Sequence, residues 1–501
     1  MRIEIDRKAG QPLYDQVAAS IREAVLSRQI AGGARLPATR TLAQDLGIHR
    51  HTVAAAYRRL EAEGLLRTAV GAGTFVVEAL PATEGERGFS WEELLRHRAG
   101  PEPDPLAYLR TGRVPVPSDP IRLNGAVPDS REFPMDGFIT CMREVLDGAD
   151  PHLLEYGPPE GYEPLRAWIA EWLADWGVEG VEAERVFIIS GSQQGIDLLA
   201  RLFLTPGDRV LLEAPTYTGA FMVLREAGAR MVTIPIAAQG LRMDELRRVL
   251  GREPIKLIYV MPCYQNPTGT SMDPLTRQEL LALAHGRGLP IIEDHYTSPL
   301  HYWGPPPRSL LSEDPEGRVI HLGTFSKFLF PGLRLGWMVV PRPLCQPLRR
   351  LRWATDLSSG TFTQQLLERF CRSGRLTDHL DRLRKINGRR LKVMLHALEK
   401  HFPAEARWTR PEGGMTLWVE LPEMIDAAEL LREAASQGVL FAPGPAFYPN
   451  GGGRSGLRLS FNREDEKRIR RGVRLLGSLV KERMRHRRPT DRTGGDAVPF
   501  L

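Results

Sequence analysis

The order of apolar segments in the middle of the chain restricts its fold more than any other feature. Between residues 185 and 326, short apolar runs rich in valine, isoleucine and leucine recur, and helical patterns separate several of them. Buried strands joined by helices build a mostly parallel sheet that helices cover on both faces. The sequence therefore predicts an α/β domain over residues 119–482. Its strand candidates are RVFIISG, RVLLEAP, KLIYVMP, LPIIEDH and RVIHLGTFS.

Two segments lack this patterning. From residue 79 to residue 118, prolines lie among polar residues with little periodicity, which indicates a linker between domains. The chain ends after a basic run, KERMRHRRPTDR, of a kind that is more typical of a solvated end than of a DNA-binding arm. We therefore expect residues 483–501 to form a disordered tail.

Composition excludes several classes of protein. No run approaches the roughly 18 consecutive apolar residues of a membrane span, and the first residues contain no apolar signal core. The four cysteines lie far apart and form no CxxC pair, which argues against a disulfide scaffold or a zinc site. We expect a cytoplasmic protein with no metal centre and no membrane partner.

Residues 1–78 carry a different pattern. Apolar residues recur at helical spacing from Leu13 to Val25, and a second short helix is expected between Gly33 and Gly47. A third helix follows in IHRHTVAAAYRRLEAEG, and LLRTAVGAGTFVVE is typical of two short strands around a glycine-rich turn. Three helices followed by a hairpin are the order of a winged helix-turn-helix domain.

The charge of this segment favours nucleic-acid contact. From Ala34 to Arg67 there are six arginines and three acidic residues. A recognition helix that packs through its apolar side leaves its other side free to reach base edges and phosphates. The alternative is a small solvated domain that mediates protein contacts. The candidate DNA-binding residues are Arg50, His51, Thr52 and Arg58 on the third helix, Arg35, Thr39 and Arg40 at the start of the second, and Gly73 in the wing.

The segment from Leu13 to Val77 resembles the GntR family of bacterial regulators. The match runs through LPATRTLAQDLGIHRHTVAAAYRRLEAEGLL and GAGTFV, and it implies binding of double-stranded DNA. His49 stands where the family usually has a serine at the start of the recognition helix, and histidine caps a helix less well than serine.

Lys327, in GTFSKFLFPGLRLGW, is the main candidate for a reactive residue in the larger domain. A lysine that forms a Schiff base must lie near an aldehyde, and its surroundings must be able to lower its pKa. Ser326 and Arg334 flank it, and a hydroxyl with a guanidinium group is suited to grip a phosphate. An isolated lysine is usually only a solvated surface residue, so the case for a pyridoxal 5'-phosphate cofactor depends on four other segments that supply what this cofactor needs.

Other segments supply what the ring of that cofactor needs. Asp294 ends a buried strand, where a carboxylate keeps the pyridine nitrogen protonated and makes the ring an electron sink. Asn266, in MPCYQNPTG, is expected to donate to the phenolate oxygen, and Tyr296 can reach the same atom. Tyr217, in APTYTG, is placed to stack on the ring. The alternatives are a helix cap or surface turn for Asp294 and a core position for Tyr217.

Two further segments complete the site. Ser192 and Gln193 open a helix after a strand, so their N–H groups and a hydroxyl can face the phosphate; the alternative is an ordinary strand-to-helix turn. Arg458 lies inside the apolar run LRLSF. A buried arginine needs a partner, which is either a ligand carboxylate bound through both N–H edges or an internal acidic residue.

Together these segments resemble the class I and II aminotransferases of fold type I, and most nearly the α-aminoadipate and kynurenine types. The resemblance extends from about Ile121 to Val480. It implies a mostly parallel sheet between helices, a small C-terminal α+β subdomain, and a homodimer with its sites at the subunit interface. Tyr156 matches the tyrosine that reaches the partner's cofactor phosphate.

A GntR-like head joined to an aminotransferase-like body resembles the MocR family of regulators, whose members are dimers, often head-to-tail. The resemblance implies a transcriptional regulator that senses pyridoxal phosphate or an amino compound. A segment that usually ends in Glu and Phe reads DHYTSPL here, so we expect Pro299 and Leu300 to line the effector side. The alternatives are a working aminotransferase that carries a DNA-binding domain, and a protein-interaction module with a vestigial site.

Overall fold

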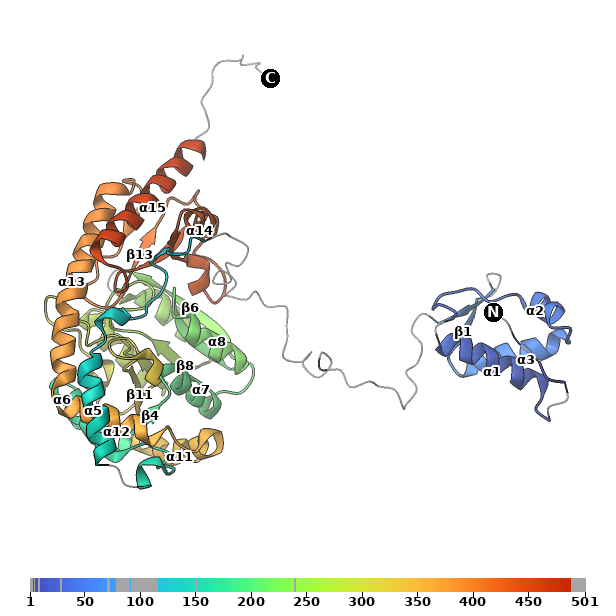
Figure 1. The fold of residues 1–501 in the computed structure, drawn as a ribbon, viewed down its shortest axis with the longest axis horizontal. Coiled ribbons are helices and arrows are strands. Elements are labelled where there is room, and N and C mark those ends of the chain that lie inside the picture. Colours follow the sequence, from blue (N-terminus) through green and yellow to red (C-terminus); the bar gives the residue numbers. More distant parts are fainter. Residues whose placement is uncertain are drawn as a thin grey trace, which may run out of the picture. The chain divides into compact units, whose positions relative to one another are not determined.

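The computed structural model describes residues 3, 5–7, 10–27, 29–69, 73–77, 91, 116–148, 151–237 and 240–487. The chain divides into two compact units, Met1–Glu102 and Pro103–Leu501 (Figure 1). Most of the expected linker, residues 79–118, lies outside the described residues, as does the expected tail beyond Arg487. Within the described ranges, no helix combines the length and apolar character that a bilayer-spanning segment needs.

The first unit is a winged helix-turn-helix domain, as predicted. Apolar side chains of its three helices and its hairpin form one core, in which Val17, Ile21, Val53 and Leu60 are fully buried. The two hairpin strands pair antiparallel. The elements are α1 (Leu13–Leu26), α2 (Thr39–Asp45), α3 (Arg50–Ala62), β1 (Leu66–Ala69) and β2 (Gly73–Val76).

The second unit is built on an eight-stranded sheet with the order β4-β11-β10-β9-β8-β5-β6-β7. The predicted strand candidates are β4, β5, β8, β9 and β10, and the last four are neighbours that run parallel. β11, which was not predicted, lies antiparallel between β10 and β4. The strands are β4 (Val186–Ile189), β5 (Arg209–Ala214), β6 (Arg230–Ala237), β7 (Gly240–Leu241), β8 (Ile255–Val260), β9 (Ile291–Asp294), β10 (Val319–Thr324) and β11 (Gly336–Val339).

Helices cover both faces of this sheet because successive strand residues point to opposite sides. Val186 and Ile188 of β4 join the core beneath α5, α6, α12 and α13, whereas Phe187 and Ile189 join the core beneath α7, α8 and α11. The helices are α5 (Met135–Asp147), α6 (Glu163–Asp175), α7 (Ser192–Phe203), α8 (Thr218–Glu226), α9 (Met243–Leu250), α10 (Pro274–His285), α11 (Arg342–Asp356), α12 (Thr361–Arg372) and α13 (Arg375–His401).

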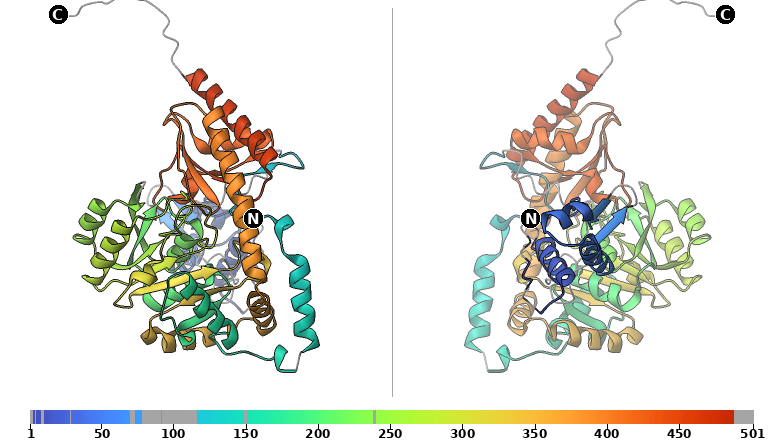
Figure 2. Two further views of the ribbon diagram at one scale, coloured as in Figure 1. Left: turned by 90° about the vertical axis from the view of Figure 1, so that its left-hand side faces the viewer. Right: turned by 90° about the vertical axis from the view of Figure 1, so that its right-hand side faces the viewer.

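The C-terminal part is the expected small α+β subdomain. A four-stranded antiparallel sheet, β12-β13-β16-β15, packs with the C-terminal half of α13 and with two further helices, and α13 and α15 lie side by side (Figure 2). A short parallel pair joins β3 to β14. The elements are β3 (Ile121–Arg122), β12 (Arg407–Trp408), β13 (Thr416–Glu420), α14 (Ala427–Ser436), β14 (Val439–Leu440), β15 (Ala442–Pro443), β16 (Gly456–Ser460) and α15 (Glu466–Arg487).

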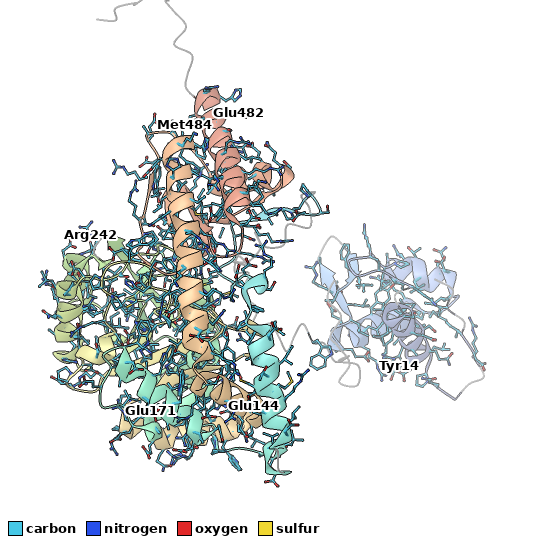
Figure 3. The ribbon with its side chains drawn as sticks, turned by 60° about the vertical axis from the view of Figure 1, so that its left-hand side comes forward. Tyr14, Glu144, Glu171, Arg242, Glu482 and Met484 are labelled. Atoms are coloured by element: carbon cyan, nitrogen blue, oxygen red, sulfur yellow. The ribbon has the colours of Figure 1, made fainter. Side chains whose placement is uncertain are left out.

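The last helix runs past the domain end expected at residue 482. It continues to Arg487, and Glu482 and Met484 lie on its final turns (Figure 3). Arg483 forms ion pairs with Glu429 and Glu433 of α14, and Met484 packs against the core of the subdomain. These contacts keep helical a segment whose basic composition is typical of a disordered tail.

Candidate cofactor site and DNA-binding face

The predicted cofactor residues gather at one edge of the large sheet. β11 is antiparallel to both β10 and β4, so β4 runs in the same direction as β10. The carboxyl ends of β4, β5, β8, β9 and β10 therefore all lie at this edge. Ligands of open α/β sheets bind outside the carboxyl ends of the strands. The residues that follow or end these strands are Ser192, Tyr217, Asn266, Asp294 and Lys327.

Lys327 lies three residues beyond β10 and points toward the N-terminal part of the second unit. Its Nζ donates to the carbonyl of Ala126 at 3.0 Å. Burial lowers its pKa to about 8; the positive charge of Arg458 adds to the shift and the negative charge of Asp294 opposes it. About a tenth of the amine is then neutral at pH 7, against under a thousandth for an ordinary lysine, and the neutral amine is the form that attacks an aldehyde.

This lowered pKa makes a kinetic prediction. The rate constant for attachment of pyridoxal phosphate to the cofactor-free protein should rise about tenfold per pH unit below pH 8 and level off above it. An ordinary lysine, with a pKa of about 10.4, would keep rising well beyond pH 9. Stopped-flow absorbance measures the rate, and the same reaction with Nα-acetyllysine corrects for titration of the cofactor itself. A profile parallel to that of Nα-acetyllysine would contradict the prediction.

Asp294 ends β9 and is almost fully buried. Its Oδ2 accepts a hydrogen bond from the Tyr259 hydroxyl at 2.9 Å, whereas its Oδ1 has no hydrogen-bond partner among the described residues. Burial raises the pKa of Asp294 to about 6, against the opposing effects of the Tyr259 hydrogen bond and the charge of Lys327. A buried acceptor without a partner is costly, and a protonated ring nitrogen would satisfy it.

Asn266 and Arg458 are joined directly. Arg458 Nη1 donates to Asn266 Oδ1 at 2.8 Å, and Nη2 donates to the carbonyl of Asn124 at 2.5 Å. The guanidinium carbon lies 4.9 Å from the centre of the Phe447 ring. Because Oδ1 accepts from Arg458, the Nδ2 group of Asn266 is the part of the amide that can donate to a ligand.

The opposite end of the site is suited to a phosphate. Helix α7 begins at Ser192, directly after Gly191, whose φ is 80°. Arg334 Nη2 donates to the carbonyl of Ser190 at 2.9 Å, and a Cβ on Gly191 would lie 2.9 Å from the same nitrogen. The buried Ser326 Oγ has no hydrogen-bond partner among the described residues. A helix N-terminus, a guanidinium group and an unpaired hydroxyl together bind phosphate.

The two remaining aromatic residues are held by neighbouring polar groups. The Tyr217 hydroxyl donates to Gln193 Oε1 at 3.3 Å, and Gln193 Nε2 donates to the carbonyl of Gly219 at 2.8 Å. The Gln193 side chain therefore orients Tyr217, and only its backbone N–H remains for the phosphate end. The Tyr296 hydroxyl donates to the carbonyl of Tyr264 at 3.1 Å, which ties it to the loop that carries Asn266.

Sequence reasoning missed two buried residues behind this site. Tyr259 supplies the hydrogen bond to Asp294, and its signal was a hydroxyl inside the apolar run KLIYVMP, since a buried tyrosine needs a partner. Glu213 accepts from the Met261 amide and from Gln265 Nε2, each at 3.2 Å. Burial raises the pKa of Glu213 to about 8, so this acid is largely uncharged at neutral pH.

The structure contradicts the expected effector-side position of Leu300 but not that of Pro299. Leu300 is fully buried in the core beneath α6 and α12, and Pro299 lines a separate cavity.

Tyr156, expected to act in a partner subunit, lies just after a short 3₁₀ turn (Pro151–Leu154) and is 86% exposed.

The start of the recognition helix α3 is capped despite the unusual residue. The His51 amide donates to Nδ1 of His49 at 3.4 Å, and the two imidazole rings stack with centroids 5.1 Å apart. Arg35 was expected at the start of α2, but α2 begins at Thr39 and Arg35 instead bridges to Phe75 of the wing. It lies beside Gly73, where a Cβ would come within 2.8 Å of its Nε.

The predicted DNA-binding side chains are accessible. Arg35, Arg40, Arg50, His51 and Arg58 are exposed, and Thr39 and Thr52 are half-buried. None of the four arginines forms an ion pair with a residue that the structure describes. By contrast, two other basic residues of the unit are neutralised internally: Arg59 pairs with Asp15 and Glu63, and Arg22 pairs with Glu63.

A lysine with a lowered pKa, a buried carboxylate with an unpartnered oxygen and a phosphate cradle define a pyridoxal-phosphate-binding domain of fold type I, joined here to a winged helix. Residues 130–476 match the family model described as aminotransferase class I and II, and residues 13–76 match that of the bacterial regulatory proteins of the gntR family. The chain therefore belongs to the class I and II aminotransferase family, and as a GntR-type regulator fused to such a domain it is a pyridoxal-phosphate-dependent transcriptional regulator of the MocR type.

Similar proteins fall into two groups. A 2-aminoadipate transaminase of Thermus thermophilus is 39% identical over 361 residues, which cover 71% of this chain and 89% of that protein. The probable rhizopine catabolism regulatory protein MocR of Rhizobium meliloti is 31% identical over 479 residues, 95% of each chain. Among solved structures, Thermus thermophilus α-aminoadipate aminotransferase, complexed with N-(5'-phosphopyridoxyl)-L-leucine, superposes with a TM-score of 0.72 at 36% identity, covering 79% of this chain and all of that one.

Proposed function

We propose that this regulator senses an amino compound, or pyridoxal phosphate itself, and transmits the event to DNA. The observation that carries the proposal is that one chain combines the residues of a cofactor site with a set of exposed arginines on a winged helix that form no ion pair with the described residues. The larger domain would bind pyridoxal phosphate and an amino compound, and the winged helix would bind DNA. In a MocR-type protein, binding at the first site controls binding at the second.

Each residue of the site has a proposed role. Lys327 attaches the cofactor, whose ring serves as an electron sink when bound. Asp294 pairs with the ring nitrogen, Asn266 and Tyr296 hold the phenolate side, and Tyr217 stacks on the ring. Ser192, Gln193, Ser326 and Arg334 hold the phosphate through N–H groups, hydroxyls and a guanidinium group. Arg458 receives the carboxylate of an amino-acid effector.

We further propose a homodimer, arranged head to tail, in which the partner's Tyr156 completes the phosphate site. Tyr156 and Leu154 are 86% and 82% exposed in the single chain, and large exposed apolar side chains side by side are typical of an interface. The effector acts by binding one arrangement of this dimer better than another, which changes the spacing of the two winged helices on DNA.

The test is a titration of amino acids into the full-length protein loaded with pyridoxal phosphate. A sensor should show a stable change in the visible absorbance of the cofactor with one amine, a parallel change in DNA affinity, and no release of oxo acid. The competing function is that of an aminotransferase. The neutral fraction of Lys327 and the presence of Arg458, which can bind a substrate carboxylate, favour it. Sustained oxo-acid release with a 2-oxo-acid acceptor would overturn the sensor.

The DNA-binding face makes its own prediction. Arg50→Gln and Arg58→Gln should each weaken binding to a duplex selected from a random pool by roughly 5- to 150-fold if the arginine reads a base. An arginine that contacts only phosphate should instead lower the salt slope of binding by about 1. Fluorescence anisotropy at several salt concentrations separates these cases. Arg59→Gln is the matched control, because Arg59 is held by Asp15 and Glu63. Equal losses in all three variants would contradict the assignment.

A further inference from the structure

The second unit contains a cavity that none of the proposed cofactor residues lines. It has a volume of about 330 Å³ and lies between the end of α6 and the loop that follows β9. Trp172 and Trp176 form one wall, Trp337 of β11 the next, and Pro299 with the segment 305–307 the third. Lys327, Asn266 and Arg458 are not among the described residues that line this cavity. Its size is at the lower end of the range of small-molecule sites.

The walls are shaped for a flat ring. Trp172 meets Trp176 at 77° with centroids 6.2 Å apart, and meets Trp337 at 71° with centroids 5.6 Å apart. Indole rings at such angles offer both faces and edges to an inserted aromatic group. Arg384 ties two of the walls together: its Nε donates to the carbonyl of Pro299 at 2.9 Å, and its guanidinium carbon lies 5.5 Å from the Trp176 ring centre.

The polar part of the lining favours an anion. Arg308 is exposed at the edge of the cavity and forms no ion pair with any described residue, and none of the described lining residues is acidic. Burial lowers the pKa of His295 to about 4, so the imidazole in the wall is neutral. The lining also includes two hydroxyls: that of Ser298 is paired with Nδ1 of His295, and that of Ser309 donates to Glu293 Oε2. A ligand with one aromatic end and one carboxylate end matches this distribution.

The same loop connects the cavity to the cofactor site. Along β9 and its loop, Asp294 and Tyr296 belong to the cofactor site, whereas His295 and Ser298 line the cavity. His295 Nε2 lies 3.0 Å from Cys263 Sγ, and the Tyr296 hydroxyl binds the carbonyl of Tyr264. Both contacts reach the segment that leads directly to Asn266. A ligand that moves His295 therefore also moves its chain neighbours Asp294 and Tyr296, which belong to the cofactor site.

We propose that this cavity binds a small aromatic carboxylate, and that its occupancy alters the affinity of the neighbouring cofactor site. It is a second input to the regulator, distinct from an amine that reacts at Lys327. Coupling of this kind is reciprocal, so the ligand must also bind the cofactor-loaded and cofactor-free proteins with different affinities.

Isothermal titration calorimetry on the full-length protein tests the proposal, with 1-naphthoate as probe and the uncharged 1-naphthamide as its partner. Leu173→Trp fills the cavity from α6 and should abolish binding of both compounds. Arg308→Gln should weaken naphthoate by roughly two- to fivefold and leave naphthamide unchanged, as expected for a rim charge. Arg287→Gln, an exposed arginine outside the cavity, is the control and should bind like the wild type. The naphthoate Kd should differ roughly fivefold or more with and without pyridoxal phosphate.

Several outcomes would overturn the proposal. Binding that is absent at millimolar naphthoate, or equal in the wild type and Leu173→Trp, would exclude the cavity as the site. Equal losses in Arg308→Gln and Arg287→Gln would exclude the proposed carboxylate contact. A naphthoate Kd that is the same with and without pyridoxal phosphate would exclude the coupling. Because Arg308 is exposed, its variant remains informative even if Leu173→Trp fails to fold. The visible band of the bound cofactor shows which variants are folded.

Discussion

Lys327→Ala is expected to abolish the visible absorbance of bound pyridoxal phosphate and to raise the Kd for the cofactor roughly 100-fold or more, about 2.7 kcal/mol. The variant loses the proposed covalent attachment of the cofactor, while the phosphate cradle and Asp294 remain. Thermal unfolding gives an independent measure. With the cofactor at 100 times the wild-type Kd, binding stabilises the wild type by about 2.7 kcal/mol, whereas a 100-fold weaker variant gains only about 0.4 kcal/mol.

Two further variants make this result specific. Lys327→Arg keeps a positive charge but cannot attach the aldehyde, so it should behave like Lys327→Ala. Lys385→Ala removes an exposed lysine of α13 and should leave the spectrum and the Kd unchanged. If Lys327→Ala retained the visible band, another amine would be the attachment point and the assignment of the site would be incorrect.

Asp294→Asn should weaken cofactor binding at pH 7 by roughly 30-fold, about 2 kcal/mol, because it removes one partner of a buried charge pair without changing its shape. The wild type should also lose affinity as the pH falls below about 6, where the raised pKa of Asp294 leaves the carboxyl protonated in the cofactor-free protein. Equilibrium titration at several pH values measures both effects. Asp294→Asn should lack the acid limb of the profile.

Tyr259→Phe should have a smaller effect on cofactor affinity than Asp294→Asn. The Tyr259 hydroxyl lowers the pKa of Asp294 by donating to it, so its removal should raise that pKa above 6. The affinity for the cofactor should then begin to fall at a higher pH than in the wild type, with a smaller loss at pH 8 than in Asp294→Asn. An unchanged acid limb would mean that the hydrogen bond to Asp294 does not control its ionisation.

The large sheet and the residues at its edge were predictable because they depend on local pattern. Each parallel strand is an apolar run, and each site residue follows such a run at a turn, so topology alone brings Asp294, Asn266 and Lys327 to one edge. The antiparallel strand β11 was missed because no α-helix separates it from the segment that carries Lys327; only the 3₁₀ turn Pro331–Leu333 lies between them.

The missed features depend on contacts across the fold. The hydrogen bond from Tyr259 to Asp294 joins residues of two strands, and nothing near either residue indicates the partner. Arg35 was assigned to the start of α2 because it follows the break at Gly32 and Gly33, yet its backbone pairs with the wing, which follows much later in the chain. Leu300 was placed by analogy of position, whereas its side chain packs in the core beneath α6 and α12.

The bond between Arg458 and Asn266 has a consequence for discrimination among amines. A carboxylate that binds Arg458 competes with Asn266 Oδ1 for the same guanidinium group, and so loosens the amide that faces the cofactor ring. An amine without a carboxylate would react with the cofactor held by Lys327 but leave the Arg458–Asn266 bond intact. A carboxylic acid without an amine would break that bond but not react with the cofactor. If Arg458 receives the carboxylate of the effector, as proposed, the site responds fully only to a molecule that presents an amine and a carboxylate together.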